Sequence, residues 1–293
     1  MEKHASPVAQ PGELVLDHVA HFVPDLAAAR AALQAMGFAV TPESAQVTQD
    51  GPAGTSNVTV MMPQGYLEFL APTLDTPNAA KLRAAMARYA GVHLACFGTP
   101  AADEEHARLA AHGFDPLPLV QLSRETETGR AAFKVIRCPP GAMPEGRVQF
   151  VEHLSPGVIW HQRWMAHANG VTKLACVFVV AGDPAAVAAR WAHFAALLAR
   201  PAARFVHLRT ARGDVLVGRR GDWERLFGDE VPAAPALAGY ALECTDPEGL
   251  ARRVLLAGAA VRKLRPRLFA AVLPAALGGS WVFGTRESLA LDR

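Results

Sequence analysis

Two pairs of metal-competent side chains recur at matching points of the sequence. His18 and His93 each lie near the start of a short apolar segment. Each segment is followed by a helical pattern that ends in Gly-Phe, and each unit then closes on a strand-like run after a glycine. That closing run carries Glu68 in the first unit and Gln149 in the second. Imidazole, carboxylate and amide groups repeated in this way could hold a divalent metal or move a proton.

The elements around these residues follow a repeated order of one strand, one helix and three strands. The first copy spans about 14–70 and the second about 92–152, and the histidine precedes the last-strand polar residue by 50 and 56 residues respectively. The pattern repeats more weakly over 173–217 and 239–283. A repeat of this size defines an architecture. The sequence therefore predicts an α+β fold of four βαβββ modules in two tandem domains, 1–165 and 166–293.

Composition narrows the class of protein. The chain has 293 residues, is 51% hydrophobic and carries a net charge of +2 without a Lys/Arg run, so neither nucleic acid nor a membrane surface is an expected partner. Its four cysteines are far apart, which disfavours a disulfide framework or a zinc knuckle. No signal-peptide core or membrane-spanning run is recognisable. We expect a cytoplasmic protein with a small-molecule ligand, and a homodimer is compatible with the sequence.

Several motifs resemble the vicinal oxygen chelate superfamily in its glyoxalase-like branch. They are Leu-Asp-His-Val at 16–19, Gly-Thr-Ser-Asn at 54–57, Tyr-Leu-Glu-Phe-Leu at 66–70, and the run from Phe-Val-Glu-His-Leu at 150–154 to His-Ala-Asn-Gly at 167–170. The resemblance covers the whole chain as two glyoxalase/dioxygenase-like domains and is more specific in 14–170. In that superfamily two units pair into a U-shaped sheet that encloses a metal and its substrate.

The resemblance implies a metal site in the first domain. Carried onto this sequence, its ligands are His18, Glu68, His93 and Gln149, converging in the cleft between the two paired units. Two imidazoles and a carboxylate suit zinc, iron, manganese, cobalt or nickel. An open coordination position would let the metal polarise a substrate oxygen. Glu68 is then also the candidate catalytic proton carrier.

The fourth ligand departs from the superfamily pattern, which has a carboxylate where this chain has Gln149. A neutral amide is a poorer ligand for a divalent cation. Glu152 would face the other side of a regular strand, although a β-bulge could bring it in. His153 shares the face of Gln149. An alternative for Glu68 itself is a buried ion pair with an arginine, because a carboxylate among apolar neighbours needs a partner.

Two further residues are candidates for substrate binding. Asn57 could point its amide at the substrate, or could simply close a turn. Trp160 could line the mouth of the pocket, but amphipathic aromatic residues also suit a role in joining the two domains. The second half has Lys173, Leu216, Tyr240 and Val282 at the corresponding positions, so we expect a scaffold domain without a metal site. Its Arg204, Arg209 and Arg212 could meet an anionic substrate or form a solvated face.

Three functions follow from these expectations. The first is a metal-dependent enzyme of glyoxalase type: a lyase, an isomerase or a ring-cleaving dioxygenase acting on a small oxygenated molecule. The alternative is a non-catalytic protein that binds and sequesters a small molecule, which Gln149 favours. The third is a structural or regulatory module that uses only the groove between the domains. Metal analysis and the Glu68→Gln variant discriminate between these three.

Overall fold

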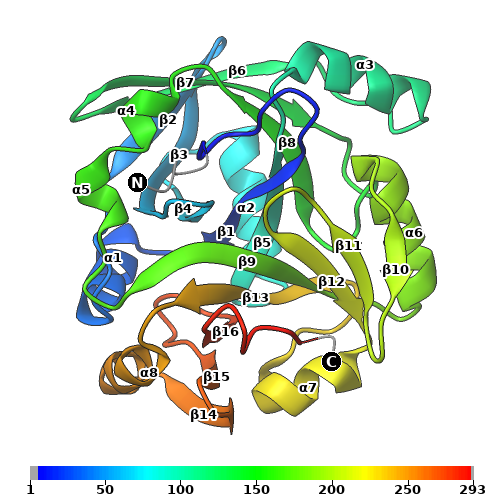
Figure 1. Ribbon diagram of the computed structural model, residues 1–293. Coiled ribbons are helices and arrows are strands. Elements are labelled where there is room, and N and C mark those ends of the chain that lie inside the picture. Colours follow the sequence, from blue (N-terminus) through cyan, green and yellow to red (C-terminus); the bar gives the residue numbers. More distant parts are fainter. Residues whose placement is uncertain (1–5, 292–293) are drawn as a thin grey trace.

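The computed structural model describes residues 6–291 and contains two eight-stranded sheets packed against one another (Figure 1). Four βαβββ modules follow one another along the chain, as predicted. The first contains β1 (Val15–Phe22), α1 (Leu26–Ala35), β2 (Ser44–Thr48), β3 (Gly51–Met61) and β4 (Tyr66–Pro72). The second contains β5 (Gly91–Gly98), α3 (Ala102–Ala111), β6 (Val120–Thr126), β7 (Gly129–Arg137) and β8 (Arg147–His153).

The other two modules build the second sheet. The third contains β9 (Val171–Val180), α6 (Pro184–Ala195), β10 (Ala199–Pro201), β11 (Val206–Arg209) and β12 (Asp214–Gly218). The fourth contains β13 (Ala236–Cys244), α8 (Pro247–Leu256), β14 (Ala260–Arg265), β15 (Leu268–Val272) and β16 (Ser280–Gly284). Short helices connect the modules: α2 (Pro77–Met86), α4 (Pro156–Ile159), α5 (Gln162–Met165), α7 (Arg220–Phe227) and the 3₁₀ helix η1 (Gly228–Glu230). The predicted domain boundary after residue 165 stays a prediction. The strands of the first sheet precede this position, and the strands of the second sheet follow it.

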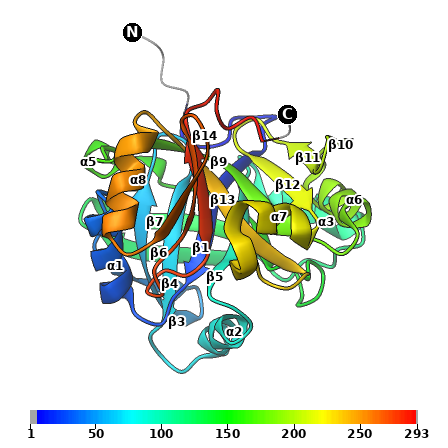
Figure 2. The ribbon, with the colours of Figure 1, turned by 90° about the horizontal axis from the view of Figure 1, so that it is seen from below.

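The first sheet closes into a barrel with the strand order β1-β4-β3-β2-β6-β7-β8-β5. β1 pairs with β5 in antiparallel orientation, and the two modules meet again where β2 pairs with β6 through Val47–Ser123 and Thr48–Leu122. This second contact differs from the open U-shaped sheet that the resemblance implied. Because the wall is closed, a ligand has to reach the interior from an end of the barrel. Helix α2 packs against β3 and β4 at one end (Figure 2).

The second sheet stays open, and apolar side chains pack between it and helix α7. Trp223 of α7 is fully buried there between the rings of Phe178 and Phe205, with centroid distances of 4.7 and 4.5 Å. Its indole Nε1 donates a hydrogen bond to the Val179 carbonyl at 3.0 Å. Leu216 belongs to the same apolar cluster. The second sheet therefore carries a packed core where the barrel carries a polar interior.

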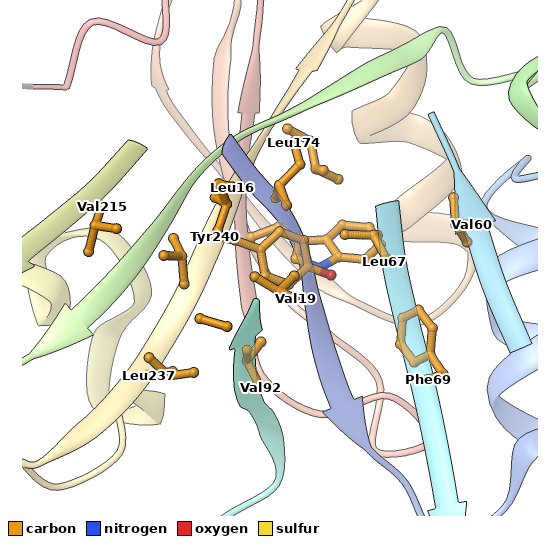
Figure 3. Packing of buried hydrophobic residues seen from close by; sticks show 14 of the residues in the cluster. Leu16, Val19, Val60, Leu67, Phe69, Val92, Leu174, Val215, Leu237 and Tyr240 are labelled. Carbon is orange, nitrogen blue, oxygen red and sulfur yellow. The ribbon is translucent and has the colours of Figure 1, made fainter. Parts of the chain in front are cut away.

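The two sheets share one apolar core (Figure 3). Leu16 and Val19 of β1 and Val92 of β5 face Leu237 and Tyr240 of β13. Burial of each such aliphatic side chain stabilises the fold by roughly 1.5–3 kcal/mol. The shared core fixes β1 and β5, which run side by side through the barrel wall.

Three of the module helices begin directly after an aspartate that caps them. The Asp25 carboxylate accepts hydrogen bonds from two backbone amides of α1, and Asp183 accepts two from α6. Asp246 caps α8 by accepting one hydrogen bond, from the Gly249 amide. Helix α3 begins at Ala102 and has no such capping aspartate. Its first amide instead donates to Glu152 Oε2 at 2.9 Å.

Candidate functional site

Side chains that point into the barrel enclose a polar cavity of about 40 Å³, here called the lumen cavity. It holds three of the four predicted ligands, His18, Glu68 and Gln149. The other polar side chains that line it are Gln46, Asn57, Tyr66, Arg124, Arg137 and Arg147. A cavity of this size has room for a few water molecules or for one small acid group.

Glu68 is held by two amides rather than by an arginine. Asn57 Nδ2 donates to Glu68 Oε1 at 2.5 Å, and Gln46 Nε2 donates to the same oxygen at 3.1 Å. Thr55 in turn donates to Gln46 Oε1 at 2.7 Å and fixes that amide. No ion pair joins Glu68 to an arginine within residues 6–291. Asn57, the predicted substrate ligand, thus lines the cavity and also orients its carboxylate.

His18 is anchored by its neighbour in sequence. Its Nδ1 lies 2.7 Å from Asp17 Oδ1, and its Nε2 lies 3.8 Å from Glu68 Oε2. The ring stacks on Tyr66 with a centroid distance of 4.4 Å. Burial works to lower the pKa of His18, but contacts with Cys96 and Asp17 outweigh it and raise that pKa well above its ordinary value.

Asp17 also binds a second histidine. His153 Nε2 lies 2.9 Å from Asp17 Oδ2, and both side chains are buried. Burial works to raise the pKa of Asp17, but His153 and His18 outweigh it and lower that pKa. The predicted alternative ligand His153 therefore supports Asp17, outside the lining of the lumen cavity.

The structure does not bring His93 to His18 and Glu68. His93 Nε2 donates to the Tyr89 carbonyl at 2.9 Å, and the imidazole stacks between the rings of Tyr89 and Phe22. It lines a different cavity, next to α2. Burial, together with the Arg88 guanidinium, lowers the pKa of His93 to about 4 and keeps the imidazole neutral.

Strand register explains this placement. Glu68 on β4 pairs with Ala20, two residues after His18, whereas Gln149 on β8 pairs with Cys96. The residue two positions before Cys96 is Leu94, and Leu94 lines the lumen cavity. Leu94, not His93, is thus the counterpart of His18. A shift of one residue along a strand places the side chain on the other face.

The donors in the lumen cavity do not complete a metal site of the predicted kind. Besides His18 and Glu68, the cavity contains the amide of Gln149. The apolar Leu94 lies where a second imidazole was expected. No group of three or more His, Cys, Asp or Glu side chains within residues 6–291 could hold a metal ion. Glu152, the other alternative, caps α3. Metal binding by His18, Glu68 and Gln149 stays a prediction.

Trp160 lies beside the site without lining it. Its indole Nε1 donates to the Met62 carbonyl at 3.1 Å, and its ring contacts Tyr66 and His153 edge-on. All of these partners belong to the barrel. The interpretation of Trp160 as a link between the two domains is therefore wrong, and direct substrate binding by it stays a prediction.

Sequence reasoning missed the three arginines of the cavity. Arg124, Arg137 and Arg147 come from β6, β7 and β8, and burial lowers the pKa of each guanidinium. For Arg147, the positive charge of the Arg137 guanidinium lowers the pKa further, and the pKa of Arg147 falls to about 9. Arg124 is only 6% exposed and forms no ion pair with another described residue. Strand alternation was the signal available, because inward positions of β6–β8 carry these cations.

Arginines of the second half do not substitute for them. Arg204 and Arg209 are exposed, and Arg212 forms an ion pair with Glu13 at 3.0 Å.

Across residues 6–291, no helix combines the length and apolar character needed to cross a bilayer.

Comparison with known proteins agrees with this architecture. The sequence matches the glyoxalase-like domain family over residues 16–195, which covers the barrel, β9 and α6. The chain therefore belongs to the glyoxalase-like domain family, and its fold is that of the vicinal oxygen chelate superfamily. A search of the curated proteins finds no match.

Solved structures share the fold at low sequence identity. A hypothetical protein from Staphylococcus aureus has 11% identity and a TM-score of 0.63, with 93% of this chain and 99% of that chain covered. A mutant 4-hydroxymandelate synthase from Streptomyces coelicolor has 13% identity and a TM-score of 0.59, with coverage of 96% and 97%. A Mn(II)-bound glyoxalase from Novosphingobium aromaticivorans has 10% identity and a TM-score of 0.55, with coverage of 95% and 83%. These likenesses define the fold and leave the activity open.

Proposed function

We propose that this protein binds a small organic acid in the lumen cavity, as a non-catalytic binding protein of the glyoxalase-like fold. The observation that carries the proposal is the buried Arg124 guanidinium, which has no ion-pair partner among the described residues. Arg137 and Arg147 line the same cavity, so three guanidiniums face Glu68, the one carboxylate among the described residues that line it. Burial of a charge without a partner is costly. A ligand carboxylate would offset that cost and form charge-assisted hydrogen bonds with a guanidinium.

Two neutral acceptors support a ligand that also carries a hydroxyl group. Asn57 Oδ1 and Gln149 Oε1 are buried and have no hydrogen-bond partner among the described residues. Unsatisfied buried acceptors are rare and point to a missing donor. A hydroxyl group next to the ligand carboxylate would supply that donor. The chemical class that fits the cavity is therefore a small hydroxy acid.

The pair of His18 and Glu68 was the basis for predicting a metal-dependent lyase, isomerase or dioxygenase. Its atoms Nε2 and Oε2 lie 3.8 Å apart, but the third protein ligand would be the neutral Gln149 amide. The surrounding guanidiniums add positive charge, which disfavours a divalent cation at the same place. These features support acid binding over metal binding.

Isothermal titration with acetate, glycolate, lactate and inorganic phosphate tests the proposal. At least one hydroxy acid should bind, and Arg124→Met should weaken its binding at least tenfold. Arg252→Met, which removes an exposed arginine from α8, is the matched control and should leave binding unchanged. Binding that Arg124→Met does not affect, or no binding of any acid, would overturn the proposal. So would one equivalent of metal that is lost on Glu68→Gln.

A further inference from the structure

A second cavity, of about 360 Å³, lies between α2 and the loop 138–146 and is here called the basic vestibule. Four cations line it: Lys81, Arg88, Arg137 and Arg147. No aspartate or glutamate is among its described lining residues, and none of the four cations forms an ion pair with a described carboxylate. Its volume falls in the range of small-molecule sites.

Arg147 and Arg88 form their hydrogen bonds and ring contacts with neutral groups. Arg147 Nη2 lies 3.4 Å from Asn78 Oδ1, and its guanidinium stacks over the Phe22 ring at 5.4 Å. Arg88 Nη2 donates to the Pro235 carbonyl at 2.9 Å. Such contacts position a guanidinium without neutralising its charge. An anion in the vestibule could therefore bind without displacing an existing carboxylate.

The two cavities adjoin one another. Arg137 and Arg147 line both the lumen cavity and the basic vestibule. The lumen cavity, at about 40 Å³, has room for one acid group but not for a larger ligand body. The remainder of a larger ligand must extend toward one end of the barrel.

The opposite end is unsuited to negative charge. Arg124 also lines a third cavity, of about 320 Å³, whose other charged residues are Glu43, Glu125 and Glu127. Glu125 and Glu127 form ion pairs with the exposed Arg130 and Arg163, and Glu43 adds a further negative charge, so this end offers no excess positive charge to an anionic ligand body. The cations of the basic vestibule have no such carboxylate partners and attract the anion. Charge thus distinguishes the two ends of the barrel and directs an acidic ligand toward α2.

We infer that the ligand is a dianion with one acid group in the lumen cavity and a second one, carboxylate or phosphate, in the basic vestibule. The inference rests on the proposed function, because it needs the first acid group to bind at Arg124. Arg137 and Arg147 then lie between the two acid groups and can contact either. Phe22 supplies an apolar surface for the carbon chain that joins them.

Isothermal titration with matched acids tests this inference. Malonate, succinate and glutarate are compared with acetate, propionate and butyrate, and 3-phosphoglycerate is compared with glycerate. At least one ligand with two acid groups, either a dicarboxylate dianion or the more highly charged 3-phosphoglycerate, should bind at least tenfold more tightly than its matched monoanion. The carboxylate and phosphate series identify which second group the vestibule takes. The double variant Lys81→Met/Arg88→Met should remove this advantage and leave monoanion affinity unchanged.

Control variants and outcomes separate the two proposals. Arg252→Met/Lys263→Met removes the same charges from exposed positions of α8 and β14 and should preserve the dianion advantage. Lys81→Met alone, which keeps the Arg88 contact with Pro235, should lower the advantage in part. Monoanion binding without any dianion advantage would overturn this inference and leave the proposed function intact. Absence of all acid binding would overturn both.

Discussion

His18 and Leu94 occupy equivalent positions in the two halves of the barrel. His18 lies two residues before Ala20, which pairs with Glu68 of β4. Leu94 lies two residues before Cys96, which pairs with Gln149 of β8. Both line the lumen cavity, so the pseudo-symmetric site has an imidazole on one side and an isobutyl group on the other. The site therefore differs from one in which both halves of the barrel contribute a histidine.

Leu94→His is expected to create the missing metal site. The variant would place a second imidazole opposite His18 and beside Glu68, a donor set that suits zinc or nickel. Titration with Zn²⁺ and Ni²⁺ should show one equivalent bound at least tenfold more tightly than by the wild type, or about 1.4 kcal/mol. Adding His18→Ala should abolish the gain, whereas adding His93→Ala should not. Equal metal affinity of variant and wild type would contradict the assigned equivalence.

Glu68→Gln should strengthen acid binding while it weakens the fold. The substitution keeps an oxygen for the Asn57 and Gln46 amides. It removes the one carboxylate that, among the described residues, lines the lumen cavity with the three arginines. We expect a loss of about 1–3 kcal/mol in unfolding free energy, because buried cations lose their counter-charge. Affinity for acetate or glycolate should rise at least tenfold. Calorimetry and chemical denaturation measure both effects, and a fall in acid affinity would contradict the proposed role of the arginines.

The strand-level pattern was readable from the sequence. Apolar runs and the repeated order of strands and helix placed all four modules, and Gly-Phe pairs marked the helix ends of the first two. Gly37, for example, adopts φ +87° directly after α1, a conformation that glycine adopts without strain. Glu68 was correctly expected to be buried, because its strand neighbours are apolar.

The site itself was only partly predictable. Matching the two histidines by spacing was off by one residue, and β1 and β5 contain register shifts that spacing alone does not reveal. The closure of the barrel depends on the pairing of β2 with β6, which are far apart in sequence. In the closed barrel, three inward-facing arginines line one cavity. Arg124, Arg137 and Arg147 are far apart in sequence and show no motif. Only the assembled barrel brings them together.

Glu152→Ala should lower stability without affecting ligand binding. The Glu152 carboxylate accepts the first amide hydrogen of α3 and so acts as its N-terminal cap. Loss of such a cap costs about 1 kcal/mol. Chemical denaturation should show this loss, whereas Glu43→Ala, an exposed control, should change stability by less than about 0.5 kcal/mol. Altered metal content or acid affinity in Glu152→Ala would instead restore this residue as a ligand.

His21 links the stability of the sheet interface to pH. Its imidazole is fully buried between the sheets, with Nδ1 3.1 Å from the Leu277 carbonyl and Nε2 3.0 Å from the Tyr240 hydroxyl. Burial lowers the pKa of His21 from 6.5 to about 3. The unfolded chain therefore binds a proton at this residue below pH 6.5 that the folded chain does not. The stability that the neutral imidazole supports is present above pH 6.5 and is lost as the pH falls toward 3.

His21→Gln removes this titration and keeps an amide that can hydrogen bond at the same place. Between pH 6 and pH 4 the wild type should lose about 2–3 kcal/mol more unfolding free energy than the variant, since each pKa unit corresponds to 1.36 kcal/mol. Urea denaturation at several pH values measures both slopes, which should coincide above pH 7.5 because neither side chain titrates there. Parallel acid slopes for the two proteins would show that the interface accommodates a charged imidazole. The assignment of a neutral, hydrogen-bonded imidazole to His21 would then be incorrect.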